Sequence, residues 1–93
     1  MPAERAEVER VLERVLGFKR SESDHHRFTL SIEGKVIAST FTSHSPKART
    51  LDDGILSDMA RQMNIRLSFL KAILAGKKTR NDYLNELNKN AAR

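Results

Sequence analysis

Apolar residues follow helical spacing at the start of the chain. They recur at intervals of three and four positions over residues 3–16, with Glu and Arg between them. This spacing predicts an amphipathic helix with one apolar face. The residues that define the face are Val8, Val11, Leu12 and Val15. Gly17 comes next, where a glycine commonly ends a helix in left-handed geometry.

The spacing changes to alternation in the segment FTLSIEGKVIASTFT, residues 28–42. Alternation and β-branched residues predict two strands, over residues 27–32 and 35–43, joined in a hairpin by Glu33 and Gly34 as a two-residue turn. Phe18 begins a further extended segment before them. We therefore expect a sheet of three antiparallel strands.

The two-residue turn predicts a register for the hairpin. Ile32 then pairs with Lys35, and successive pairs join Leu30 to Ile37, Phe28 to Ser39 and His26 to Phe41. The core face would carry Phe28, Leu30, Ile32, Ile37 and Phe41. The exposed face would carry His25, Arg27, Thr29, Ser31, Val36, Ala38, Thr40 and Thr42, with His44 near its end. A single bulge would shift the register by one residue and exchange the two faces, which would put His26 instead of His25 on the exposed face.

Helical spacing returns over residues 52–64 and in shorter segments beyond them. Asp52 or Asp53 is expected to cap the first of these helices and Asn64 to end it, and Ser68 or Thr79 to cap the later ones. The apolar positions are Ile55, Leu56, Met59, Ala60 and Met63, then Leu67, Phe69, Leu70, Ile73 and Leu74, and finally Tyr83, Leu84 and Leu87. The order of elements predicts one α+β domain over residues 1–87, with helices on one face of the sheet and a frayed tail at residues 88–93.

The charge of the chain narrows the choice of partner. Lys and Arg number 17 against 12 Asp and Glu, which gives a formal net charge of +5. This balance favours a polyanionic partner such as RNA, DNA or an acidic protein. The chain has no cysteine, which excludes disulfides and a Cys-based zinc site. No signal peptide or apolar span is visible, so we expect a cytoplasmic protein that contacts no membrane.

Three histidines are the candidate catalytic groups: His25, His26 and His44. An imidazole titrates near neutral pH and can act as an acid or a base. Neighbours on a strand point to opposite faces, which disfavours a metal site built from the adjacent pair. The chain also has no Gly-rich phosphate loop, nucleophile elbow or cluster of carboxylates at metal-ligand spacing. We therefore expect no metal and no cofactor.

Two stretches of the chain carry a family resemblance. VLGFKRSESDHHRF, followed by the hairpin and by TSHSPKARTLDDGILSDMARQMNI, resembles the HicA family of toxin components, over roughly Val8 to Leu74. The resemblance implies a fold like that of a double-stranded-RNA-binding domain, ordered α-β-β-β-α. It also implies a toxin that cleaves mRNA as a metal-independent endoribonuclease. A HicB-type antitoxin would neutralise it, with the toxin a monomer when free and part of a hetero-oligomer when bound.

The family's motif, Gly-Ser-His-x-x-aromatic, falls on this chain with His25 as the catalytic histidine and Phe28 as the aromatic residue. Ser23 and Asp24 replace the Gly-Ser pair, which puts a carboxylate beside that histidine. His44 is the candidate second acid or base, and His26 is expected to be structural, or catalytic if the register shifts. The expected RNA contacts are Arg27, Lys35, Lys47, Arg49, Lys77, Lys78 and Arg80.

Two other functions remain open from the sequence. One is a non-catalytic module that binds double-stranded RNA, and the other is an inactive protein of the toxin fold that only binds a partner. A double-stranded-RNA module is expected to present a Lys-rich helix N-terminus to the phosphates. Here the helix after the hairpin begins with Leu51, Asp52, Asp53 and Gly54. The acidic start repels phosphate and favours the toxin.

Overall fold

A computed structural model describes residues 3–22, 26–42 and 50–91 of the chain. In chain order its elements are β1 (Ala3–Glu4), α1 (Arg5–Arg10), η1 (Val11–Val15), β2 (Lys19–Glu22), β3 (His26–Ile32), β4 (Lys35–Thr42), β5 (Thr50–Leu51), α2 (Asp53–Gln62), α3 (Leu67–Leu74) and α4 (Arg80–Ala91).

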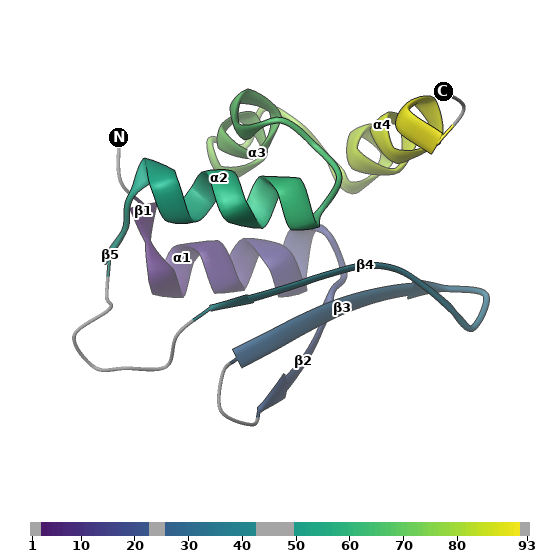
Figure 1. Ribbon diagram of the computed structural model, residues 1–93, viewed down its shortest axis with the longest axis horizontal. Coiled ribbons are helices and arrows are strands. Elements are labelled where there is room, and N and C mark those ends of the chain that lie inside the picture. Colours follow the sequence, from purple (N-terminus) through teal and green to yellow (C-terminus); the bar gives the residue numbers. More distant parts are fainter. Residues whose placement is uncertain (1–2, 23–25, 43–49, 92–93) are drawn as a thin grey trace.

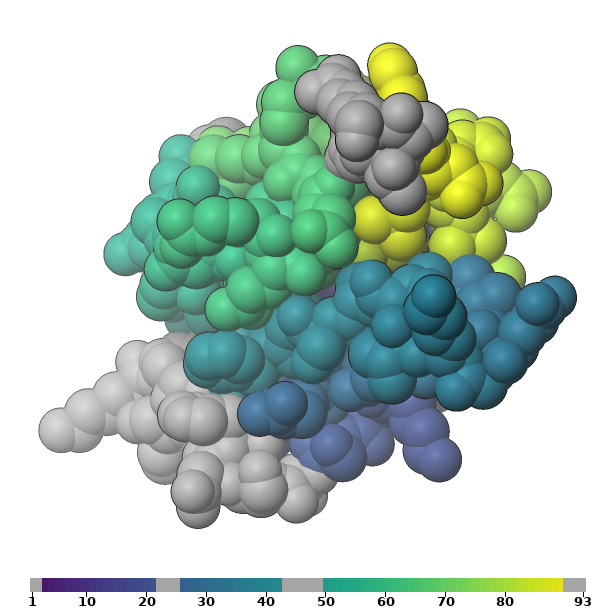
Figure 2. Space-filling model, turned by 45° about the vertical axis from the view of Figure 1, so that its right-hand side comes forward, coloured from purple at the N-terminus to yellow at the C-terminus, as the bar shows by residue number. Residues whose placement is uncertain are grey.

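The fold has two layers. Strands β2, β3 and β4 form an antiparallel sheet in that order, and the helices lie together on one side of it (Figure 1). The predicted α+β class and the three-stranded antiparallel sheet are thereby confirmed. Figure 2 shows the β3–β4 hairpin running beside the helical layer formed by the later part of the chain. The opposite side of the sheet carries no helix within the described residues.

A separate pairing that the sequence did not predict joins the start of the chain to its middle. Strand β1 pairs with β5 in antiparallel register, Ala3 with Leu51 and Glu4 with Thr50. This pairing fixes the N-terminal end of α1 next to the start of α2. Each strand has only two residues, which is too short to give an alternation pattern.

The first helix changes geometry along its length. It is α-helical through Arg10 and then forms a π-helical turn, η1, in which the amide of Leu16 donates to the carbonyl oxygen of Val11 at 3.1 Å. The wider turn places one extra residue in the helix and rotates the positions that follow. Leu16 is therefore fully buried, while Val15, the expected core residue, is only partly buried. Gly17 ends the helix with a φ of 81°, as predicted.

The hairpin has the predicted turn but a different register beyond it. Glu33 and Gly34 both have positive φ, 53° and 79°, which suits a two-residue turn between twisted strands. Ile32 pairs with Lys35 as expected. A bulge follows, however, because Ser31 pairs with Val36 while Leu30 pairs with Ala38. Ile37 is the extra residue on β4.

The bulge exchanges the two faces of β4 and corrects the prediction. Beyond it, Phe28 pairs with Thr40, Arg27 with Phe41 and His26 with Thr42. Ala38, Thr40 and Thr42, expected on the exposed face, are buried against the helices. Phe41, expected in the core, lies on the outer face with 43% of its surface exposed. The assignment of β3 itself holds, since Phe28 and Leu30 are buried.

The helical layer follows the sequence pattern closely. Asp52 caps α2 by accepting a hydrogen bond from the amide of Ile55 at 3.0 Å, and Asn64 follows that helix with a φ of 64°. The side chain of Ile55 is exposed, in contrast to the prediction, because it lies on the outer edge of the apolar stripe. Helix α4 includes residues 88–91, which the sequence assigned to a tail.

Helix α4 is joined to the rest of the core through Tyr83. Its ring packs at 6.0 Å from that of Phe18, and its hydroxyl donates to the carbonyl oxygen of Met63 at 3.0 Å. Thr79 caps the helix through reciprocal bonds with Asp82. The last helix is therefore part of the single core.

Candidate functional site

A carboxylate, an imidazole and a hydroxyl meet between α1 and the sheet. His26 Nδ1 lies 2.7 Å from Glu9 Oε2, and Thr42 Oγ1 donates to the same oxygen at 2.5 Å. The side chains of His26 and Glu9 are 15% and 10% exposed. A charged carboxylate this deeply placed needs such partners, because an uncompensated buried charge is strongly unfavourable. The contact joins three elements: α1, β3 and β4.

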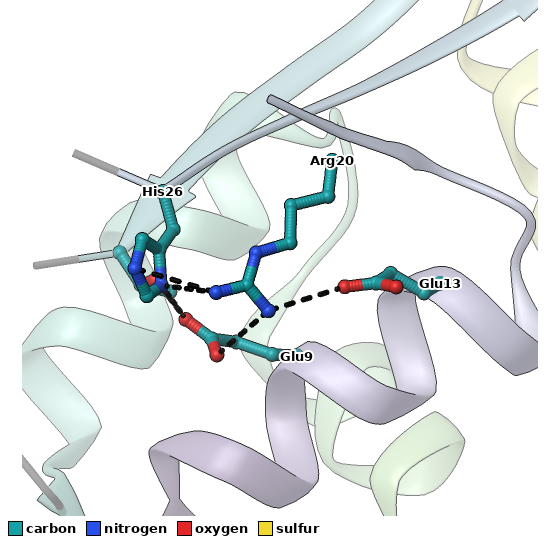
Figure 3. A network of polar contacts seen from close by, with 5 residues as sticks. Glu9, Glu13, Arg20 and His26 are labelled. Atoms are coloured by element: carbon teal, nitrogen blue, oxygen red, sulfur yellow. Dashed lines mark hydrogen bonds and ion pairs between the residues drawn. The ribbon is translucent and has the colours of Figure 1, made fainter. Parts of the chain in front are cut away.

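Arg20 completes the group from strand β2 (Figure 3). Its Nη2 lies 3.2 Å from His26 Nδ1 and 3.3 Å from His26 Nε2. A nitrogen equidistant from both ring nitrogens would collide with the carbon between them if it lay in the ring plane. The guanidinium therefore lies over the face of the imidazole. Its Nη1 is 3.8 Å from Glu9 Oε1 and 3.5 Å from Glu13 Oε1.

Strand register explains why these side chains meet. Residues paired across antiparallel strands point to the same side of the sheet. Arg20 pairs with the buried Phe28, and His26 pairs with the buried Thr42, so all of them face the helices. Glu9 reaches them from α1 because it follows the core residue Val8 at the edge of the apolar stripe.

The environment of Glu9 favours its charged form. Burial acts to raise the pKa of this carboxyl and is the largest single influence. The hydrogen bonds from Thr42 and His26, with the charges of His26 and Arg20, outweigh burial and hold the pKa below its ordinary value. Glu9 is therefore a carboxylate at neutral pH.

The pairing with Glu9 sets the proton arrangement on the imidazole. A carboxylate only accepts, so His26 Nδ1 is the donor in this contact. In the neutral ring the basic lone pair is then on Nε2. A carboxylate that holds one ring nitrogen in this way fixes the tautomer and orientation of a histidine acid or base.

A surface cleft adjoins the group on the α1 side. It has a volume of about 500 Å³ and is lined by Glu4, Arg5, Ala6, Glu9 and Thr50. The β1–β5 pairing brings Thr50 next to Glu4, and so forms one wall of the cleft. Glu9 therefore contacts His26 on one side and lines an open cleft on the other.

The structure places only some of the residues that the sequence selected. His25, His44, Lys47 and Arg49 lie outside the described residues, so their roles stay predictions. His26, expected to be structural or a substitute for His25, forms the polar group described above.

The expected RNA-binding residues that the structure describes lie on two different parts of the molecule. Arg27 lies on the outer face of the sheet and Lys35 follows the hairpin turn, whereas Lys77 and Lys78 are in the segment between α3 and α4. Lys78 Nζ lies 5.5 Å from the centre of the Phe69 ring. The Nε of Arg80 donates to the carbonyl oxygen of Leu16 at 3.2 Å, so this arginine holds α4 against the end of the first helix.

Sequence reasoning missed Glu9, Arg20 and Thr42. For Arg20 a signal was present, because it follows the apolar Phe18 by two positions and so shares its side of the strand. For Thr42 the signal was hidden by the bulge, and for Glu9 it required the packing of α1 on the sheet.

Comparisons with protein-family models, curated proteins and solved structures find no match for this chain. No three His, Asp or Glu side chains among residues 3–22, 26–42 and 50–91 are grouped so that they could hold a metal ion. Within the same residues, no helix is both long enough and apolar enough to span a membrane.

Proposed function

We propose that this protein is an endoribonuclease toxin that cleaves mRNA without a metal ion and is neutralised by a HicB-type antitoxin. The arrangement of Glu9, His26 and Arg20 is the observation that carries the proposal. The order α1, β2, β3, β4, α2 is compatible with the double-stranded-RNA-binding-domain-like fold that the family resemblance implies.

The group contains what RNA cleavage through the 2′-hydroxyl requires. A base removes the proton of the 2′-hydroxyl, the 2′-oxygen attacks the adjacent phosphorus, and the bond to the 5′-oxygen breaks as that oxygen receives a proton. His26 Nε2 is the proposed base. Arg20 supplies positive charge for the phosphate as negative charge develops on its oxygens. His25 and His44 remain the candidates for the acid that protonates the leaving oxygen.

The contacts of His26 support it over His25 as the principal histidine. The family motif and strand alternation selected His25, which lies outside the described residues, whereas the bulge on β4 leaves His26 on the helix-facing side of β3. His26 has the carboxylate partner that orients an imidazole, and it lies within reach of an arginine. The proposal therefore assigns His26 to catalysis and Glu9 to its positioning.

A double-stranded-RNA-binding module is the second candidate function, and α2 speaks against it. Asp52 occupies the N-cap of this helix, and Asp53 in its first turn accepts a hydrogen bond from Lys71 at 2.9 Å. These carboxylates compete with phosphate for the helix N-terminus. A phosphate contact at α2 would therefore be electrostatically unfavourable.

Expression in a bacterial host tests the proposed toxicity. The parent chain is expected to arrest growth and fragment cellular mRNA, and co-expression of an antitoxin encoded beside it should restore growth. His26→Gln keeps an amide donor for Glu9 but cannot exchange a proton, so it should abolish arrest at equal protein level. If His26→Gln arrests growth as strongly as the parent and His25→Ala does not arrest growth, then His25 is the catalytic histidine. Absence of arrest and RNA fragmentation in the parent would refute the proposal.

A further inference from the structure

The outer face of the sheet is a defined surface on the side opposite the helices. Cross-strand pairing aligns Ser21, Arg27 and Phe41 in one row and Lys19, Thr29 and Ser39 in the next. Side chains directly paired in this way lie close enough to act on one ligand. All six are at least partly exposed, whereas the residues that alternate with them on β3 and β4 face the helices.

The charge of this face has one sign in the described structure. Lys19 and Arg27 are its charged residues, and neither forms an ion pair with a carboxylate of the described residues. This contrasts with Arg20, which follows Lys19 in β2, points to the helix side of the sheet and lies between Glu9 and Glu13. The cation on the helix side of the sheet is therefore balanced by carboxylates, whereas the two cations on the outer side are not balanced by carboxylates of the described residues.

Phe41 gives the face an aromatic surface beside these cations. It is paired directly with Arg27 and is 43% exposed. Exposed aromatic rings on a basic, hydroxyl-bearing sheet suit nucleic acid strands whose bases are unstacked, because each base has a flat face that can lie on the ring. A base-paired duplex keeps its bases stacked internally and cannot use such a ring.

We propose that the outer sheet face binds single-stranded RNA, with a base stacked on Phe41 and phosphates neutralised by Arg27 and Lys19. The assignment rests on the proposed function only in taking RNA as the ligand. Arg27 follows His26 directly in β3, but the two side chains point to opposite faces of the sheet. An RNA strand bound on the outer face therefore has to continue around the end of β3 to reach His26.

The basic corner between α3 and α4 is the competing location for RNA. Lys77 and Lys78 lie in the helical layer, and the ring of Phe69 is partly buried against the core with Lys78 Nζ 5.5 Å from its centre. That corner thus offers charge, but its ring is less exposed than Phe41 and already has a lysine beside it. Lys77 consequently provides a matched control for Lys19, with the same side chain and the same change of charge.

Binding can be measured separately from cleavage. The probe is a fluorescein-labelled, ten-nucleotide, single-stranded RNA with 2′-O-methyl groups, which removes the attacking hydroxyl. Fluorescence anisotropy gives its Kd between 50 and 200 mM KCl. Phe41→Leu should raise Kd about 5- to 150-fold, the range for loss of one stacked base. Lys19→Gln and Arg27→Gln should each reduce the slope of log affinity against log salt by about 0.7, while Lys77→Gln leaves the slope unchanged.

A single tryptophan provides a direct test of stacking. The chain contains none, so Phe41→Trp introduces a unique reporter, whose fluorescence should be quenched when the single-stranded probe binds. The same probe in a duplex should bind more weakly and leave the fluorescence unchanged.

Two results would overturn the proposal. The first is that folded Phe41→Leu and Lys19→Gln proteins bind the RNA probe with the same Kd and the same salt slope as the parent. In that case the probe does not bind this face, and an acidic protein would be the remaining ligand for it. The other is tryptophan fluorescence of the Phe41→Trp protein that stays unquenched at saturating probe. If the parent protein binds the probe normally but does not cleave RNA, the result counts against the proposed catalytic group and not against the RNA-binding face.

Discussion

The hydrogen bond between Thr42 and Glu9 should stabilise the fold in a pH-dependent way. Thr42 is 2% exposed and donates to a carboxylate at 2.5 Å. Thr40 lies two residues earlier on the same side of β4, is 1% exposed, and donates to the neutral amide oxygen of Gln62 at 2.6 Å. Thr→Val at each position removes the hydroxyl while keeping a β-branched side chain. The two variants thus differ mainly in the charge of the acceptor.

The expected magnitudes follow from that difference. A hydrogen bond to a charged group contributes about 1.5–3 kcal/mol and one between neutral groups about 0.5–1.5 kcal/mol. Thr42→Val should therefore lower the free energy of unfolding by about 2 kcal/mol at pH 7, and Thr40→Val by about 1 kcal/mol. The extra apolar methyl group affects both variants alike, so it cancels in the comparison.

The pH dependence has a definite sign. Because the pKa of Glu9 is lower in the folded protein than in the unfolded chain, its ionisation stabilises the fold above the unfolded value. This contribution disappears as pH falls through the folded value. The excess loss in Thr42→Val should thus be complete at pH 7 and shrink in acid, while the loss in Thr40→Val stays constant.

Urea denaturation followed by circular dichroism from pH 8 to pH 3 measures both losses. Carbon NMR of the Glu9 carboxyl provides an independent check, since its pKa should rise in Thr42→Val. Equal, pH-independent losses in the two variants would show that Thr42 does not stabilise a charged Glu9, and would refute the reasoning.

Three further substitutions test the fold. Tyr83→Phe should lower the free energy of unfolding by about 1–2 kcal/mol, because the buried carbonyl of Met63 loses its donor. Burial also raises the pKa of Tyr83, so the ultraviolet titration of this tyrosine in the folded protein should occur at a higher pH than that of free tyrosine. Asp52→Ala should cost about 1 kcal/mol through loss of the bond to the Ile55 amide, measured by thermal melting. Gly34→Ala should cost about 1 kcal/mol from backbone strain alone, since φ is 79° and no atom lies within 4 Å of the added carbon; an unchanged melting temperature would contradict the assigned turn.

The parts of the fold that local sequence determines were predictable. The Glu33-Gly34 turn, the Asp52 cap and the glycine after the first helix each depend on a few neighbouring residues, and the structure has all three. The alternation of β3 was equally clear, because Phe28 and Leu30 differ strongly from the polar residues between them.

The sequence prediction was wrong where packing between elements that are distant in the sequence determines the local structure. The bulge at Ile37 and the π-helical turn before Leu16 each shift the residues that follow by one position, and neither has a local composition signal. The β1–β5 pairing joins residues almost fifty positions apart. These features settle which residues face the helices, so the sequence alone misplaced Phe41 and Thr42.

The candidate site was predictable only in its histidine. The adjacent pair His25 and His26 is conspicuous in a chain with three histidines. Its partners come from α1, β2 and β4, and bringing them together requires the correct register of the whole sheet. Arg20 is the one of these partners that had a local signal, because alternation from Phe18 points it toward the helices, and the sequence prediction missed it.

Cleavage of one defined RNA by purified protein in the presence of EDTA tests the central claim most directly. The parent, His26→Gln, Glu9→Gln and His25→Ala proteins are compared at equal concentration, each with its thermal melt. The account predicts that His26→Gln loses about 10²- to 10⁴-fold in rate while remaining folded. Glu9→Gln should lose less and show an altered pH–rate profile, because Glu9 acts through the imidazole. Parental cleavage and pH profile in a folded His26→Gln protein would contradict the account.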